Sequence, residues 1–194
     1  MPRCGSAIIL DPLLEQLLAP RGSGCGDHPM CAHSQQALRA PADAVVLDLD
    51  LASRLRAIGE PSLVGSVALG GMVARDIDLT VAVLALPAAQ PAIITLGTAL
   101  LAHSRVRQVT LRDDTGGWNT NPGYPDGWYL GIQYVAREQA WTLDIWFVDQ
   151  PDRQPDLAHL RELAPRITDQ ARQTIVALEA SGTPTTGRSA NDEL

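Results

Sequence analysis

The most informative motif of this chain is Gly65-Ser66-Val67-Ala68-Leu69-Gly70, followed by Asp76-Ile77-Asp78-Leu79. Alternate residues of a strand point to the same face, so Asp76 and Asp78 are expected side by side. Their Cα atoms would lie about 7 Å apart, close enough to share hard cations. The Gly65-Ser66 turn offers backbone amides and a hydroxyl to an anion. This pattern predicts a phosphate group held beside divalent cations.

A third acid stands in an apolar setting much later in the chain. Asp144 lies within Trp141-Thr142-Leu143-Asp144-Ile145-Trp146-Phe147. A charged side chain inside such a strand is costly unless it is paired. Its partner is expected to be either a metal ion shared with the first two acids or one of the arginines.

These motifs resemble the signature of the nucleotidyltransferase superfamily, which has the DNA polymerase β-like fold. In that family a Gly-Ser turn precedes an Asp-x-Asp strand, and a later strand supplies a third carboxylate. The resemblance covers residues 43–149. It implies that Asp76, Asp78 and Asp144 bind two Mg²⁺ ions. It also implies that Asp144 helps to take a proton from an acceptor hydroxyl, and that Gly65 and Ser66 hold the β- and γ-phosphates of ATP or another nucleoside triphosphate.

The chain departs from the family pattern in its cations. Many relatives carry arginine or another polar residue at the positions of Val67 and Leu69, which are aliphatic here. Arg75 is then the nearest cation for the phosphates, although a solvent-facing role suits it equally. All fifteen cationic residues are arginine, so a P-loop lysine is excluded.

The predicted fold class is α+β, an α/β sandwich with a mixed sheet of four or five strands and helices mainly on one face. Strands are expected over 62–65, 77–86, 106–111, 128–135 and 141–148, the last two joined by a turn at 137–139. Helices are expected over 10–20 and 43–58, from Pro91, from Asp156 and from Pro165. Asp43 is the expected cap of the second helix. A second acidic pair, Asp48 and Asp50, falls in that helix and is predicted to lie on its solvated surface.

The chain divides into three expected parts. Residues 1–42 form an N-terminal helix and a Gly- and Cys-rich segment, 43–181 the nucleotidyltransferase domain with its C-terminal helices, and 182–194 a disordered tail. The first part contains Cys25, His28, Cys31 and His33. This spacing matches no common zinc finger, so a segment with incidental Cys and His is favoured over a zinc site.

The aromatic residues gather in one region: all eight lie between Trp118 and Phe147. Trp118 and Tyr124 fall in a loop expected over 113–127, where burial is difficult. They are predicted to stack on the nucleotide base or on the acceptor. The alternative is a loop pinned to the body of the protein by its own aromatic residues.

The net charge of −7 and the isoelectric point near 4.9 argue against binding of long nucleic acid. No apolar run has membrane-spanning length, and three cysteines before position 32 give no disulfide framework. A cytoplasmic protein is expected, with a homodimer possible through the C-terminal helices.

The predicted function is Mg²⁺-dependent transfer of a nucleoside monophosphate to a hydroxyl of a small molecule, with release of pyrophosphate. Two alternatives remain open. One is toxin-like modification of a protein or tRNA, and the other is an inactive, nucleotide-binding or antitoxin-like partner.

Overall fold

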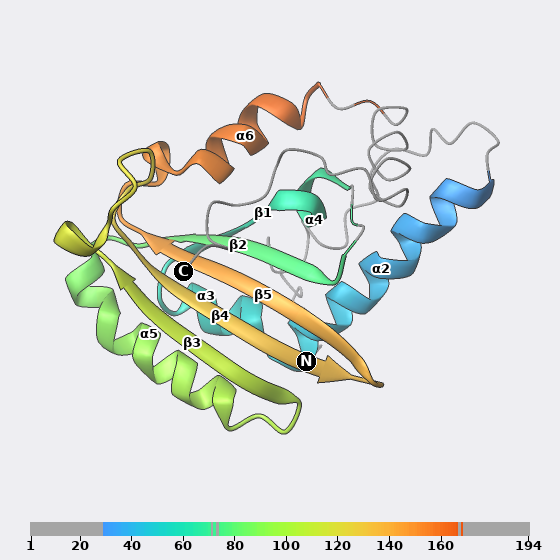
Figure 1. Cartoon of the computed structure of the whole chain (residues 1–194), viewed down its shortest axis with the longest axis horizontal. Coiled ribbons are helices and arrows are strands. Elements are labelled where there is room, and N and C mark those ends of the chain that lie inside the picture. The colour runs from blue at the N-terminus through green and yellow to red at the C-terminus, as the bar shows by residue number, and fades with distance from the viewer. Residues whose placement is uncertain (1–28, 71, 73, 167, 169–194) are drawn as a thin grey trace, which may run out of the picture.

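A five-stranded mixed sheet organises the chain (Figure 1). The structure, a computed structural model, describes residues 29–70, 72, 74–166 and 168. Along the chain its elements are α2 (Pro29–Asp48), α3 (Leu51–Arg56), β1 (Glu60–Val64), α4 (Gly65–Leu69), β2 (Asp76–Ala82), α5 (Leu86–Leu101), β3 (Val106–Asp114), the 3₁₀ turn η1 (Gly116–Trp118), β4 (Gly127–Ala136), β5 (Gln139–Val148), η2 (Pro151–Arg153) and α6 (Pro155–Leu163).

The strand order is β1-β2-β5-β4-β3. Strands β2 and β5 pair in parallel, whereas the other three pairings are antiparallel. A mixed sheet flanked by helices is the α+β architecture that the sequence predicts. The parallel pairing joins two strands that are far apart in the sequence, and those are the two that carry the acidic residues.

The two faces of the sheet differ in character. One face carries the apolar residues of the strands, such as Ile77, Leu79 and Ile145, and packs in the core with residues of α2, α3 and α5. On the other face, α4 and α6 lie over the β1–β2 side (Figure 1). Side chains of a strand alternate between the two faces of the sheet, so burial of every second residue determines which face packs in the core.

Two neighbouring rows of residues cross this second face, one residue from each strand. Their members are opposite one another in the strand register. From β1 to β3 the first row is Val64, Asp78, Asp144, Gly131 and Thr110, and the second is Ser62, Thr80, Trp146, Tyr129 and Arg112.

The β4–β5 hairpin confirms the predicted pair of strands. Its turn consists of Arg137 and Glu138, both with positive φ angles of 49° and 64°. Two left-handed residues in sequence give a tight turn whose twist matches the flanking strands. The turn therefore sets which residues of β4 and β5 lie opposite each other.

The helix predicted over 43–58 is wrong in its bounds. Asp43 lies inside α2, where it pairs with Arg39 at 3.3 Å instead of capping a helix. The helical path breaks at Asp50, which adopts a left-handed conformation before α3 begins. Aspartate tolerates this conformation better than most residues. Leu47, four residues before the buried Leu51, is 56% exposed.

Asp48 is more than a solvated surface acid. Its carboxylate accepts a hydrogen bond from the Tyr134 hydroxyl at 2.8 Å and forms an ion pair with Arg105 at 3.0 Å. Tyr134 is a buried residue of β4. These contacts tie the end of α2 to the start of β3 and the core.

Other bounds shift by a few residues. The first strand ends at Val64, because Gly65 opens α4, and β2 ends at Ala82 rather than at residue 86. Helix α5 begins before Pro91, with another proline in its first turn, a position that needs no backbone donor. Asp156 does not cap α6: it lies in the first turn and accepts a hydrogen bond from Gln154.

Several predictions fall outside the described residues: the helix over 10–20, most of the helix after Pro165, the tail, Cys25 and His28. The backbone of Cys31 and His33 belongs to α2, but their side chains are not described. Helix α2 also crosses the expected boundary between residues 42 and 43. None of the described helices is both long and apolar enough to cross a membrane.

Candidate active site

Asp76, Asp78 and Asp144 lie on the same face of the two central strands. Asp78 of β2 is directly opposite Asp144 of β5 in the parallel register, and Asp76 is two residues earlier on β2. Neighbouring strands are about 4.8 Å apart and alternate residues of one strand about 7 Å apart. The structure therefore brings together the three acids that the sequence analysis singled out.

Asp78 is the centre of this acidic group. Burial, followed by the charges of Asp76, Asp144 and Asp156, raises the pKa of the Asp78 carboxyl from 3.8 to about 7. Burial and neighbouring negative charges both disfavour the ionised form. Asp156, which the sequence analysis treated only as a helix cap, is thus a fourth acid near the site, presented by α6.

The Gly65-Ser66 turn packs directly against Asp78. Gly65 has a φ of +62°, and a Cβ atom at this position would collide with the carboxylate of Asp78. Glycine is therefore required both for its backbone conformation and for the close approach. The hydroxyl of Ser66 is buried and has no hydrogen-bond partner within the described part of the chain. Ser66 directly follows the glycine that packs against Asp78.

The position of Val67 in the structure explains why its side chain is aliphatic. Its side chain is fully buried in the core, so a polar side chain would be costly there. Its carbonyl accepts a hydrogen bond from the guanidinium of Arg39 at 2.9 Å, which ties α2 to α4. Arg39 is thus the cation that the structure places against this helix.

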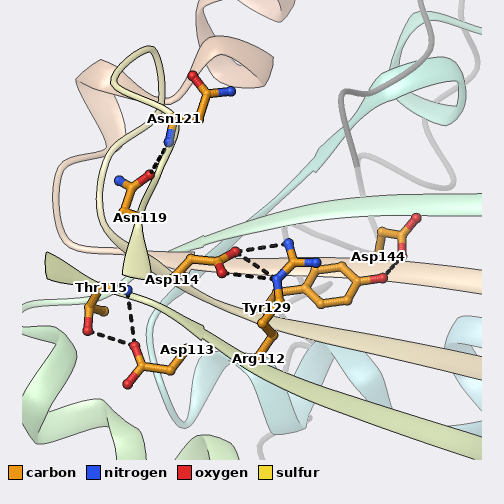
Figure 2. Close-up of polar contacts among 8 residues, drawn as sticks. All are labelled: Arg112, Asp113, Asp114, Thr115, Asn119, Asn121, Tyr129 and Asp144. Carbon is orange, nitrogen blue, oxygen red and sulfur yellow. Dashed lines mark hydrogen bonds and ion pairs between the residues drawn. The ribbon is translucent and has the colours of Figure 1, made fainter. Parts of the chain in front are cut away.

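The hydroxyl of Tyr129 donates a hydrogen bond to Oδ1 of Asp144 at 2.5 Å (Figure 2). Tyr129 reaches across Gly131, where a Cβ atom would strike the tyrosine ring and hydroxyl. Burial and the bond to Asp144 raise the pKa of Tyr129, so the hydroxyl keeps its proton and acts as a donor. The Asp144 carboxylate is consequently held in place through one of its oxygens, Oδ1.

Arg112 completes this part of the face. Its guanidinium lies 4.8 Å from the ring centroid of Tyr129 and 5.6 Å from that of Trp146. Two of its nitrogens contact Asp114 at 2.9 to 3.0 Å (Figure 2). Tyr129 and Arg112 are not among the residues predicted from the sequence. The only local signal is the Tyr-x-Gly spacing at 129–131, which gains meaning once the hairpin register is known.

The candidate residue Arg75 and a further acid, Asp149, lie apart from this group. Arg75 is exposed just before β2, and its carbonyl accepts a hydrogen bond from the amide of Thr142. Its part in phosphate binding therefore stays a prediction. Asp149 lies beyond β5, with Oδ2 3.5 Å from the amide of Leu86 at the start of α5. A carboxylate near a helix N-terminus is favourable, which gives Asp149 a structural role.

The loop after β3 is held by its own hydrogen bonds. The side chain of Asn119 donates to Tyr124 and Asp126, and Asp126 also accepts from the amide of Gly116. Trp118 is 78% exposed. Burial, followed by the charge of Asp156, raises the pKa of Tyr124, and the same acid also raises the pKa of Asp78. Ligand stacking by this loop stays a prediction.

The acidic group has the chemistry of a Mg²⁺ site, because that ion prefers carboxylate oxygens and its charge would relieve the repulsion around Asp78. Within the ranges that the structure describes, however, no three acidic, histidine or cysteine side chains converge closely enough to form a metal site as they stand. Oδ1 of Asp144 is directed to Tyr129. The carboxylates are neighbours that would have to turn toward one another to bind an ion.

No model of a protein family matches the chain, and no curated protein does. Among solved structures, it is similar to the crystal structure of small alarmone synthetase 1 from Bacillus subtilis, bound to its product pppGpp. The identity is 12% and the TM-score 0.38, over 77% of this chain and 87% of that chain. So distant a likeness assigns no activity, since one fold supports many functions.

Proposed function

We propose that this protein transfers a nucleoside monophosphate from ATP or another nucleoside triphosphate to a hydroxyl group of a small molecule, with Mg²⁺. The observation that carries the proposal is the position of Asp78. It lies beside Asp76 and Asp144 and is packed against the Gly65-Ser66 turn. Acids that repel one another next to a candidate phosphate-binding turn suit a metal-dependent phosphoryl site.

Asp76, Asp78 and Asp144 are the residues that would hold Mg²⁺, which when bound would neutralise phosphate charge and lower the pKa of the acceptor hydroxyl. The amides of Gly65 and Ser66 and the Ser66 hydroxyl, which has no hydrogen-bond partner among the described residues, would bind the β- and γ-phosphates. Asp144, fixed through Oδ1, would take the acceptor's proton on Oδ2.

The reaction needs no reactant besides the acceptor hydroxyl and the nucleoside triphosphate. The acceptor oxygen forms a bond to the α-phosphorus, and the bond from that phosphorus to the bridging β-phosphate oxygen breaks. Pyrophosphate carries away the electron pair, while the proton passes to Asp144. The acidic surface favours a small acceptor over long nucleic acid, because a net charge of −7 repels a phosphate backbone. Modification of a protein or tRNA is a second outcome of the same chemistry.

A nucleotide-binding protein without turnover is the other candidate. One observation favours it: Val67 is buried in the core, so this position offers the phosphates no charged or polar side chain. Such a protein would bind the nucleotide and Mg²⁺ at the same residues yet release no pyrophosphate.

The test combines calorimetry with ATP and Mg²⁺ and an assay of pyrophosphate release over a panel of hydroxyl-bearing compounds. Asp78→Asn should abolish release, whereas Asp50→Asn, a matched change at an exposed acid outside the site, should not. Nucleotide binding without release for any acceptor supports the second candidate. Failure to bind ATP in the presence of Mg²⁺ contradicts both.

A further inference from the structure

Arg112, Tyr129 and Trp146 form a cluster on the sheet face, beside the acids. We call these three residues the ring platform. The rings of Tyr129 and Trp146 lie 5.2 Å apart, and the Arg112 guanidinium covers both. The central carbon of the guanidinium lies over both rings, while 42% of the Arg112 side chain remains exposed.

The chemistry of Arg112 favours a flat ligand over a phosphate. Asp114 contacts Nε and Nη2, so it neutralises the charge and occupies one edge of the guanidinium. A phosphate would compete with that carboxylate for the same edge. The flat face of a guanidinium, by contrast, stacks well on aromatic rings, and Asp114 fixes its orientation. Arg112 is therefore prepared for a planar partner.

The ring platform lies on a definite side of the acids. The Gly65-Ser66 turn joins β1 to α4, the acids are on β2 and β5, and Arg112 is on β3, two strands beyond Asp144. Two strand spacings are about 10 Å. In phosphoryl transfer the attacking and leaving oxygens lie roughly in line on opposite sides of the phosphorus. If the leaving pyrophosphate is held at Gly65-Ser66, the attacking group comes from the side of Asp144 and Arg112.

We propose that the acceptor carries a planar aromatic or heteroaromatic ring, which stacks on Arg112 of the ring platform and brings its hydroxyl to Asp144. This inference rests on the proposed function and names its acceptor class. Tyr129 belongs to both parts of the site, because it supports Arg112 with its ring and holds Asp144 with its hydroxyl. Tyr129 thereby links Arg112, on which the ring of the acceptor stacks, to Asp144, which takes the proton of the acceptor hydroxyl.

The test measures binding of matched probes that differ in a ring, without ATP. Phenyl β-D-glucoside is compared with methyl β-D-glucoside, and adenosine with ribose, by calorimetric titration and ligand-observed NMR. The wild-type protein should bind at least one ring-bearing probe about tenfold more tightly than its ring-free counterpart, as expected for stacking on one base-sized ring.

Arg112→Lys keeps the charge but removes the flat face, so it should abolish this preference. Arg107→Lys, an exposed arginine of the same strand, is the matched control and should preserve it. Asp114→Asn leaves Arg112 in place but frees its edge and should weaken the preference, which provides a second variant if Arg112→Lys is poorly folded. Melting temperatures establish that each variant is folded.

Three results would overturn the inference: no ring preference in the wild-type protein, full preference in Arg112→Lys and Asp114→Asn, or loss of preference in a Trp118→Ala/Tyr124→Ala variant while Arg112→Lys retains it. The two proposals can fail separately. A ring preference that depends on Arg112 in a protein that releases no pyrophosphate refutes transfer alone. Release that is equally fast with ring-free acceptors refutes the ring platform alone.

Discussion

The Tyr129 hydroxyl holds Oδ1 of Asp144 across the space that a side chain at Gly131 would fill. Three residues on two strands thus act together: a donor, an acceptor and a glycine that lets them meet. The bond restricts the acid that the proposed mechanism uses as proton acceptor. A carboxylate held through one oxygen presents its other oxygen in a limited set of directions, and this orientation is what the proposed chemistry needs.

Tyr129→Phe tests the role of this bond. The variant keeps the ring under Arg112 but frees Asp144, so we expect kcat of nucleotide transfer to fall about tenfold or more, with little change in KM for ATP. The melting temperature should change little, since one hydrogen bond contributes about 1 kcal/mol. Gly131→Ala, which displaces the tyrosine, should give the same kinetic defect. Unchanged kcat in both variants would show that the bond is only structural.

The pKa of Asp78 predicts an unusual pH dependence of stability. Its folded-state pKa of about 7 lies above the ordinary value of 3.8, so the native state holds this proton more tightly than the unfolded state. The associated stability is fully present below pH 3.8 and is lost as the pH rises to about 7, an effect on the order of a few kcal/mol.

Denaturant unfolding between pH 4 and pH 8 without divalent ions measures this effect. Asp78→Asn should flatten the dependence, because the amide does not titrate. Added Mg²⁺ should restore stability at pH 8 if the acids bind it. A wild-type protein whose stability is the same at both pH values would contradict the assignment of Asp78 as the buried, repelled acid.

Asp76→Asn should separate activity from stability. The change removes one negative charge that raises the pKa of Asp78, so the metal-free protein should be as stable as the wild type or slightly more so. Nucleotide transfer should be lost, because one of the proposed metal-binding carboxylates is gone. Thermal melts in the presence of a chelator and an assay of pyrophosphate release provide the two measurements. A large drop in melting temperature would identify Asp76 as a structural ion-pair residue.

Substitution of Trp118 and Tyr124 tests whether the loop between β3 and β4 contacts the ligand. Replacing both by alanine should raise KM or lower kcat about tenfold if they contact the base or acceptor, since stacking contributes about 1–3 kcal/mol per base. Trp118 is 78% exposed, so Trp118→Ala alone should change stability by less than about 0.5 kcal/mol. If activity is intact but stability falls by several kcal/mol in the double variant, these residues pin the loop to the body.

Tyr134→Phe is a structural counterpart outside the site. The buried Tyr134 hydroxyl donates to Asp48 and links the end of α2 to the sheet. Its removal should lower the free energy of unfolding by about 1 kcal/mol, as for other single hydrogen bonds, and leave nucleotide transfer unchanged. Denaturant unfolding and the transfer assay on the same preparation measure both effects. A kinetic defect would mean that this link extends to the acids.

Local sequence patterns were sufficient to single out the three acids and to place Asp76 and Asp78 on one face. Asp76 and Asp78 are separated by one residue in an apolar strand, so their common face follows from strand geometry alone. Asp144 stands out because burial of an unpaired charge is costly. The glycine at position 65 precedes a serine in a pattern that predicts a turn. For the same reason, the hairpin around Arg137 and Glu138 and the α+β class could be predicted from the sequence.

The break at Asp50 could not be read from periodicity. The leucines on both sides continue a helical spacing, and only packing of α2 and α3 against the sheet decides that Leu51 is buried and Leu47 exposed. Tertiary burial commonly overrides such local preferences, since propensity differences are below about 1 kcal/mol per residue for most side chains.

The spacing of the acids, the apolar strands and the turns are local features, so they could be predicted from residues within a few positions of one another. Three contacts depend instead on the assembled sheet: Asp78 lies opposite Asp144, Tyr129 reaches over Gly131, and Arg112 lies above both rings. Those contacts depend on strand order and register across the whole sheet. A shift of one residue in any pairing would send the side chains to the opposite face, and local sequence does not specify that choice.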